Sequence, residues 1–209
     1  NELRMSNYRR ILSLDSAMVV VQFDKDGVQY QRKYFISYPD SVMVMKFTAN
    51  QSGKQNLILS YCPNSEAKSN LRADGKDGLV YTGVLDNNGM KFAFRIKAIH
   101  KGGTLEAEND RLIVKGADEV VFLLTADTDY KMNFNPDFKD PKTYVGNDPE
   151  QTTRIMMDQA VQKGYDELYR NHEADHTALF NRVRLQLNPD ISSPNLPTYC
   201  LLYTSPSPR

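Results

Sequence analysis

The chain has 209 residues, in which 26 Lys and Arg balance 26 Asp and Glu, so its formal net charge is zero. A chain without net charge lacks the long-range field that concentrates proteins on nucleic acid or on anionic membranes, which excludes both as expected partners. Twelve Tyr and nine Phe favour strand-rich packing, whereas the lack of Trp removes the side chain most often used to stack on sugar rings.

The first third of the chain predicts three strand patterns. Apolar residues alternate with polar or small ones at Leu12 and Leu14 and again at Val19, Val21 and Phe23, as in half-buried strands. The pair Asp26-Gly27 predicts a hairpin turn, and further strands are expected over residues 28–36 and 42–47.

The middle of the chain continues the same pattern. Strands are expected over residues 56–62, 79–85, 90–100, 104–107, 111–115 and 120–125, with a polar loop at 63–78 and turns at 87–89 and 102–103. The segment 120–125 is apolar throughout, so it should be buried on both faces as a central strand. Eight to ten short strands at this spacing are typical of an antiparallel sandwich.

The period then changes to that of a helix. After a connector rich in Pro, Asp and Asn, Asp148 and Pro149 predict a helix N-cap and first helical position. Apolar residues recur every three or four positions from 151 to about 183, which indicates an amphipathic helix broken or bent near Gly164. The predicted organisation is a sandwich domain at 1–132, a connector and helical linker at 133–198, and a separate tail at 199–209.

The helix contains one match to a catalytic motif, HEADH at residues 172–176, which has the zinc-binding pattern HExxH. A zinc protease needs a third protein ligand, and the longer form of the motif requires Gly and His where Leu179 and Arg182 stand. We therefore predict no metal site, and expect His172, His176 and Phe180 to form a stripe that packs against a neighbouring domain, with Glu173 solvated.

Three other groups of charged residues have simpler interpretations than a site. Asp24, Asp26 and Gly27 resemble the start of a calcium loop, but a hairpin turn explains them without a ligand. Further along, four acids, Asp127, Asp129, Asp137 and Glu150, could be paired carboxylates of a glycosidase, yet we expect solvated acids in an irregular connector. The basic residues Arg9, Arg10, Arg32 and Lys33 are expected to be charges that protect edge strands from aggregation.

A family resemblance rests on the order of short motifs: YRRILSLDSA (8–17), GVQYQRKYFISYPD (27–40), VMVMKFTA (42–49), KGGTLEAENDRLIVKGADEVVFLLTADTDY (101–130) and YDELYRNHEADHTALFNRVRLQL (165–187). This order resembles the N-terminal β-domain and following helical linker of glycoside hydrolase family 95, the α-L-fucosidases. The resemblance covers nearly the whole chain. It implies a mainly β fold, an antiparallel super-sandwich that lacks its first strands, followed by an α-helical linker.

The same resemblance implies an inverting glycoside hydrolase that releases terminal α-L-fucose, or L-galactose in some members, without a metal or other cofactor. In that family the catalytic residues belong to an (α/α)6 barrel that follows the linker, so no catalytic, cofactor-binding or metal-binding residue is expected in this chain. The expected partners are that barrel and a fucosylated glycan, and the expected location is periplasmic or secreted. The fragment alone should be inactive.

Both ends of the chain carry expectations of their own. The opening residues lack an initiator Met and an export signal, so we expect upstream sequence to precede Asn1. The end, CLLYTSPSPR, resembles one reading frame of a sequencing adapter, so Tyr199 is expected to be the last native residue. Cys62 and Cys200 give no disulfide framework. Two alternatives stay open: a stand-alone sandwich that binds carbohydrate, which needs an exposed aromatic platform that the sequence does not clearly show, and a structural or adhesion domain.

Overall fold

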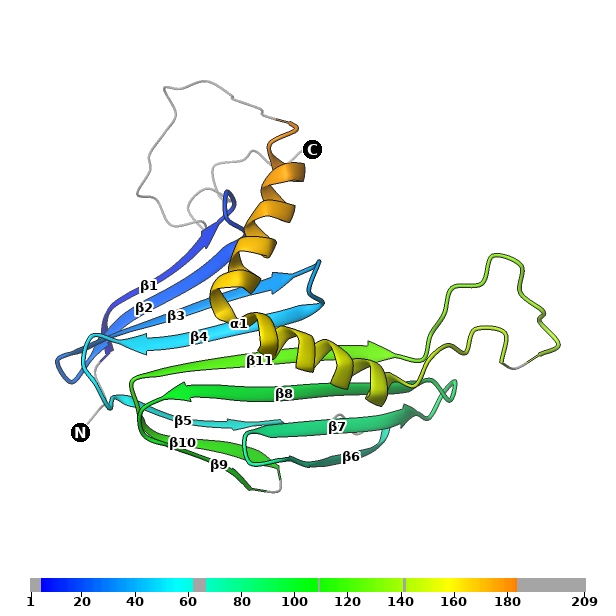
Figure 1. Cartoon of the computed structure of the whole chain (residues 1–209), viewed down its shortest axis with the longest axis horizontal. Helices are drawn as coiled ribbons and strands as arrows, with labels where there is room; N and C mark the ends of the chain where they lie inside the picture. The colour runs from blue at the N-terminus through cyan, green and yellow to red at the C-terminus, as the bar shows by residue number, and fades with distance from the viewer. Residues whose placement is uncertain (1–4, 62–66, 109, 141, 184–209) are drawn as a thin grey trace, which may run out of the picture.

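The computed structural model describes residues 5–61, 67–108, 110–140 and 142–183, and Figure 1 shows the whole chain. Within these residues the chain forms two antiparallel sheets and one long helix that lies on the larger sheet. The strands are β1 (Met5–Ser13), β2 (Met18–Lys25), β3 (Val28–Ser37), β4 (Val42–Ala49), β5 (Gln55–Ser60), β6 (Ala67–Asp74), β7 (Gly78–Leu85), β8 (Lys91–Lys101), β9 (Thr104–Glu108), β10 (Arg111–Ala117) and β11 (Glu119–Thr128), and the helix is α1 (Pro149–Phe180).

The larger sheet has eight strands in the order β1-β2-β3-β4-β11-β8-β7-β6, and the smaller has the order β5-β10-β9. β11 lies between β4 and β8, where Leu123 is opposite both Val44 and Lys97. Its residues from Val120 to Leu123 are all buried, because one face meets the smaller sheet and the other meets α1. The predictions of a sandwich, of a helix after it and of a central strand at 120–125 are confirmed.

Two apolar layers hold these three tiers together. Phe122, Leu112 and Val114 belong to the layer between the sheets, and each is at most 1% exposed. On the opposite face of the large sheet, Val44 and Leu123 pack with Leu168 of α1. Since burying one such side chain contributes roughly 1.5–3 kcal/mol, the helix is held mainly by this second layer.

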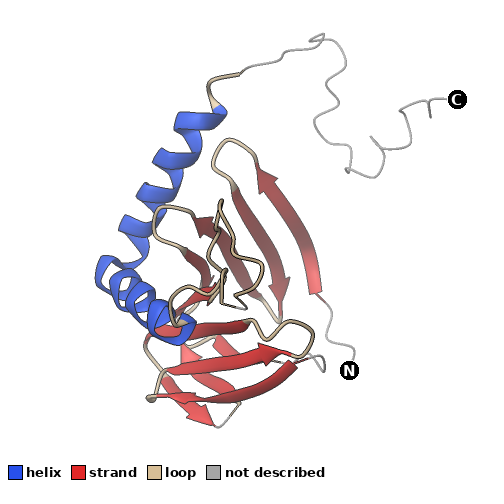
Figure 2. Cartoon of the chain, turned by 90° about the vertical axis from the view of Figure 1, so that its right-hand side faces the viewer, coloured by secondary structure: helices blue, strands red, loops and turns tan. Residues whose placement is uncertain are grey.

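The helix begins and bends where the sequence predicts. The Asp148 carboxylate accepts a hydrogen bond from the backbone N–H of Glu150 at 3.1 Å, and Pro149 follows it. At Gly164 the backbone has φ 73° and ψ 172°, a conformation outside the helical region that glycine adopts readily. Figures 1 and 2 show that the two halves of α1 consequently run in different directions along the sheet.

The hairpin turn at Asp26-Gly27 is also confirmed, because both residues have positive φ, 53° and 74°. This is the backbone of a two-residue turn whose twist matches that of the flanking strands.

Three sequence predictions are corrected. β6 lies inside the stretch 63–78 that was expected to be a polar loop; within it Leu71 stands among mostly polar neighbours, as suits an edge strand. Leu12 and Leu14 are 61% and 62% exposed rather than half-buried, since Leu12 lies in β1 at the opposite edge of the sheet and Leu14 lies in the turn that follows it. β11 continues through Thr128, so Asp127 belongs to a strand and not to the connector.

Candidate functional site

The two histidines of the HEADH motif bind backbone carbonyls of the turn between β1 and β2. His172 Nε2 lies 3.1 Å from the Ser16 carbonyl oxygen and 3.2 Å from that of Ala17, and His176 Nε2 lies 2.7 Å from the Leu14 carbonyl oxygen. A carbonyl only accepts, so both Nε2 atoms carry hydrogen and donate. Neither atom is then free to bind a metal, and both tie the helix to the turn.

The same helix face carries a stack of rings. Phe35 of β3 stacks on His172 with centroids 4.9 Å apart, and His176 stacks on Phe180 at 5.0 Å. Glu173 accepts a hydrogen bond from the Tyr169 hydroxyl at 3.1 Å. The predicted stripe is confirmed, and it packs on the sandwich itself; Glu173 is half-buried rather than solvated. Among the described residues, no three His, Cys, Asp or Glu side chains are grouped so that they could hold a metal ion.

Asp40, in the turn between β3 and β4, is the centre of a second attachment of the helix. Its carboxylate, 2% exposed, receives hydrogen bonds from Lys163 Nζ at 2.6 Å, Asn171 Nδ2 at 3.1 Å and Ser37 Oγ at 2.6 Å. Burial alone would raise the pKa of Asp40, but these hydrogen bonds and the charge of Lys163 outweigh burial and hold the pKa below its ordinary value of 3.8.

The four acids that could have formed a glycosidase pair each have a structural contact. Asp127 accepts from the Thr128 N–H, Asp129 from the Lys91 N–H, and Asp137 from the Lys139 N–H. Glu150 pairs with Arg72. Asp129 is 7% exposed, so the expectation of a solvated acid is wrong for it: it anchors the end of β11 to the start of β8.

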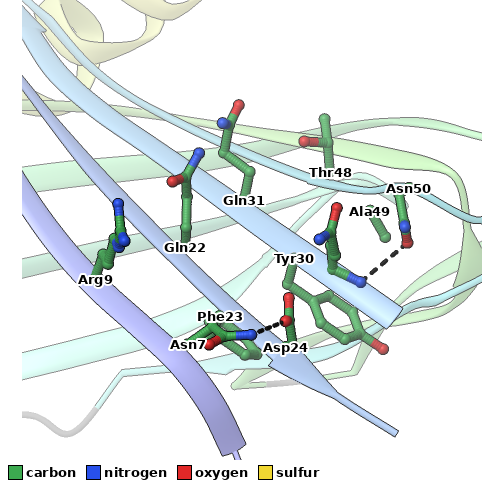
Figure 3. Close-up of a pocket in the computed structure, with 11 residues that line it drawn as sticks. Asn7, Arg9, Gln22, Phe23, Asp24, Tyr30, Gln31, Thr48, Ala49 and Asn50 are labelled. Carbon is green, nitrogen blue, oxygen red and sulfur yellow. Dashed lines mark hydrogen bonds between the residues drawn. The ribbon is translucent and has the colours of Figure 1, made fainter. Parts of the chain in front are cut away.

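A groove of about 490 Å³ crosses the large sheet near the hairpin turn between β2 and β3. Figure 3 shows Arg9, Gln22, Gln31 and Thr48 standing on one side of the ribbon, with Tyr30 on the other. These four polar residues come from four adjacent strands and are direct cross-strand neighbours, Arg9 with Gln22, Gln22 with Gln31, and Gln31 with Thr48. They form one polar row.

The remaining lining residues carry little charge and combine amide groups with aromatic and apolar side chains. They are Asn7, Phe23, Asp24, Gln29, Tyr30, Ala49 and Asn50. Asn7 Nδ2 donates to Asp24 at 2.6 Å, and the Asn50 side-chain oxygen accepts from the Gln29 N–H at 3.0 Å, so these residues are already oriented. Motifs along the chain do not reveal this row, because its residues meet only when four strands pair.

The predicted role of the basic residues is corrected for Arg32. Its guanidinium lies over the rings of Phe23 and Phe47, 5.2 and 5.3 Å from their centroids, on the face of the sheet that meets β5, β9 and β10 in the sandwich. It therefore packs between aromatic rings instead of only protecting an edge. Arg9 lines the groove.

Apolar side chains gather where α1 ends. Ile36 and Tyr38 near the β3–β4 turn are 66% and 83% exposed, and Leu179 and Phe180 are 57% and 42% exposed. They line one shallow pocket together with His176. A second exposed pair, Phe134 and Phe138, lies in the connector at 94% and 85% exposure. The sequence does not show these exposed rings clearly, because a connector without periodicity does not reveal which of its side chains face solvent.

Together these features define an antiparallel sandwich domain whose polar motifs serve mainly to attach α1. The chain matches the model of the glycosyl hydrolase family 65 N-terminal domain over residues 1–133, more than half of its length, and it belongs to that family. The prediction of a glycoside hydrolase N-terminal domain is thus confirmed; the matching model carries the family number 65, where the sequence motifs resembled family 95.

Two curated relatives are named as fucosidases, and one solved structure shares the fold. The chain is 28% identical to "Probable alpha-fucosidase A" of Aspergillus niger over 98% of its own length and 26% of the relative, and 28% identical to "Alpha-L-fucosidase 2" of Arabidopsis thaliana over 88% and 24%. It thus spans about a quarter of each relative. "Putative kojibiose phosphorylase from human microbiome" superposes with a TM-score of 0.57 at 10% identity, covering 86% of this chain and 26% of that one, which shows the fold.

No helix in the described part of the chain is both long and apolar enough to cross a membrane.

Proposed function

We infer that this chain is the accessory N-terminal part of an inverting glycoside hydrolase that removes terminal α-L-fucose, or L-galactose, from glycans. The observation that carries this proposal is the match to two proteins named as fucosidases along 98% and 88% of the chain. The family match to a glycosyl hydrolase N-terminal domain supports the coarser part of the proposal, that the intact protein is a glycoside hydrolase. The catalytic barrel would lie in the part of the protein that corresponds to the rest of these relatives.

In this role the sandwich and α1 brace the catalytic part. The helix is attached at both halves, by Thr125, whose hydroxyl donates to the Thr153 carbonyl at 3.0 Å, and by Asp40 and the two histidines. Beyond these attachments lies the apolar patch of Ile36, Tyr38, Leu179 and Phe180. A contiguous apolar surface at the exit of a linker helix suits the docking of a further domain of the same protein.

The experiment is to sequence the source gene beyond Thr198 and to assay two proteins, the complete product and the present chain, for release of L-fucose from a fucosylated oligosaccharide. The expected result is release by the complete product and none by the chain alone. A stop codon directly after Tyr199, or a complete product that cleaves other glycans but no fucoside, would contradict the proposal.

A further inference from the structure

The polar row of Arg9, Gln22, Gln31 and Thr48 has unused hydrogen-bonding capacity. Within the described part of the chain, no protein group is hydrogen-bonded to these four side chains. A side-chain amide offers both donors and an acceptor, and neighbouring strands lie about 4.8 Å apart, so the row presents such groups at regular steps over about 14 Å. A rigid sheet is a precise support for a binding surface of this kind.

The charge of the groove indicates what it can bind. Arg9 and Asp24 are its only charged residues among those that line it, and they have opposite signs. Further along the same row, beyond Thr48, Glu119 is already paired with Lys46 at 2.8 Å and Lys101 at 2.9 Å. The groove therefore lacks the cluster of cations that a phosphorylated or sulfated ligand needs.

Apolar partners fit the groove no better. The side chains of its row are charged, amide or hydroxyl groups, and covering unpaired amides with an apolar surface would leave their hydrogen bonds unsatisfied. A neutral ligand rich in hydroxyl groups satisfies the same amides, since each hydroxyl both donates and accepts.

We propose that this groove binds a neutral oligosaccharide, with the amides of Gln22 and Gln31 as the central contacts and Arg9 and Thr48 at the two ends. In this proposal the groove holds glycan chains on the sandwich. The choice of fucosylated glycans as ligands rests on the proposed function, whereas the polar chemistry of the groove does not.

The test is titration of the chain with fucosyllactose and with lactose, followed by nuclear magnetic resonance of the side-chain amides. The amide signals of Gln22 and Gln31 are expected to shift as sugar is added. In the double variant Gln22→Ala/Gln31→Ala the dissociation constant should rise about tenfold, because two hydrogen bonds are lost.

The matched control is Gln159→Ala/Gln162→Ala, the same change at two exposed positions of α1, which should bind as the original chain does. Thermal unfolding of both double variants shows whether each is folded. Groove amides that stay unshifted up to the solubility limit of both sugars, or equal affinities in the two double variants, would overturn the proposal.

Two further comparisons distinguish a general sugar site from a fucose-specific one, and a sugar site from an interface between domains. If lactose and fucosyllactose bind equally, the groove takes neutral sugars and the proposal stands without its link to fucose. If the Gln22 and Gln31 amides are shielded from solvent in the complete protein without sugar but not in the chain alone, the groove is an interface between domains and the glycan proposal is wrong. Fucose release by the complete protein is scored independently, so failure of the proposed activity does not count against the groove.

Discussion

Asp40 shows how one residue of a turn determines where a helix lies. Its carboxylate is 2% exposed and is contacted from both halves of α1, by Lys163 before the bend at Gly164 and by Asn171 after it. A buried carboxylate with charged and neutral donors is favourable only while all of them stay in place. The position of the helix and the ionisation of Asp40 are consequently linked.

The first prediction concerns the pH dependence that this link creates. Because the pKa of Asp40 lies below its ordinary 3.8 in the folded chain, the carboxylate stabilises the fold above that pH, and this contribution is lost as the pH falls below 3.8. Asp40→Asn should lower the free energy of unfolding at neutral pH by about 1 kcal/mol and flatten its decline in acid. Urea unfolding between pH 2.5 and pH 7, a range of about 4.5 units chosen to span the titration, measures both effects. Asp158→Asn, at an exposed position of α1, is the matched control and should keep the original pH profile.

The second prediction concerns His172, which is 6% exposed, stacks on Phe35 and donates to the β1–β2 turn. His172→Ala should lower the free energy of unfolding by about 2–3 kcal/mol, since a ring contact is lost and two partly buried carbonyls lose their donor. The matched control is His100→Ala, which removes a ring that is hydrogen-bonded to the nearby Gly102 carbonyl in the turn after β8, and it should have a much smaller effect. Added zinc should leave the melting temperature of the original chain unchanged, and a rise that depends on both His172 and His176 would restore the metal interpretation.

At the scale of elements, the bend in α1 allows one helix to follow two different parts of the sheet. The first half binds β11 through Thr125 and Thr153. The second half places Tyr165 and Tyr169 edge-on against Phe35 of β3, with ring centroids 5.9 and 5.7 Å away. Burial raises the pKa of Tyr165 to about 12, as expected for a phenol held inside this contact. A straight helix would meet only one of the two surfaces.

The third prediction is that Gly164→Ala disrupts this arrangement. No atom lies within 4 Å of the added Cβ, so the cost is purely conformational, about 1–3 kcal/mol for a side chain forced into this backbone geometry. Urea unfolding should show the loss, and the tyrosine signals of Tyr165 and Tyr169 should shift as the second half detaches. Gly89→Ala, also at positive φ with free space around it but in the exposed β7–β8 turn, should leave those tyrosine signals in place. Equal tyrosine shifts in both variants would show that the bend does not position the second half.

The elements were predictable to the extent that their signals are local. The cap at Asp148, the bend at Gly164, the turn at Asp26-Gly27 and the apolar run of β11 each depend on neighbouring residues, and each is confirmed. β6 was missed because an edge strand needs few apolar residues, and a polar segment is equally compatible with a loop. The polar row of the groove could not be predicted from the sequence, since it depends on the register of four strands.

At the scale of the whole molecule, β1 is an edge strand with apolar side chains in solvent. Tyr8, Ile11 and Leu12 are 59%, 46% and 61% exposed, and one side of the strand has no partner strand in the described sheet. Exposed, long, apolar edges are sites where sheets of different molecules pair. The two nearby arginines, Arg9 and Arg10, moderate this tendency without covering the apolar surface.

The fourth prediction is that the chain alone self-associates in proportion to its concentration, and that Leu12→Lys reduces this association. Lysine on an edge strand opposes pairing by charge. Sedimentation velocity over a range of concentrations measures the effect, with Ile155→Lys as control, since Ile155 is 51% exposed on the helix and away from any strand edge. A monomer that unfolds sharply and cooperatively at all concentrations would contradict the prediction.

The position of β11 also determines when the large sheet can be completed during synthesis. β1 to β4 are consecutive and can pair as a simple meander when they leave the ribosome. The other side of β4 pairs with β11, with Met43 opposite Leu124, so that side of β4 stays unpaired until nearly the whole sandwich has been made. Closing such a long loop is slow compared with forming hairpins, and unfinished sheets aggregate. Until β11 has been synthesised and has paired with β4, the incomplete sheet can bind chaperones. We therefore expect the yield of folded chain to depend more on how fast β11 pairs than on the stability of the finished fold.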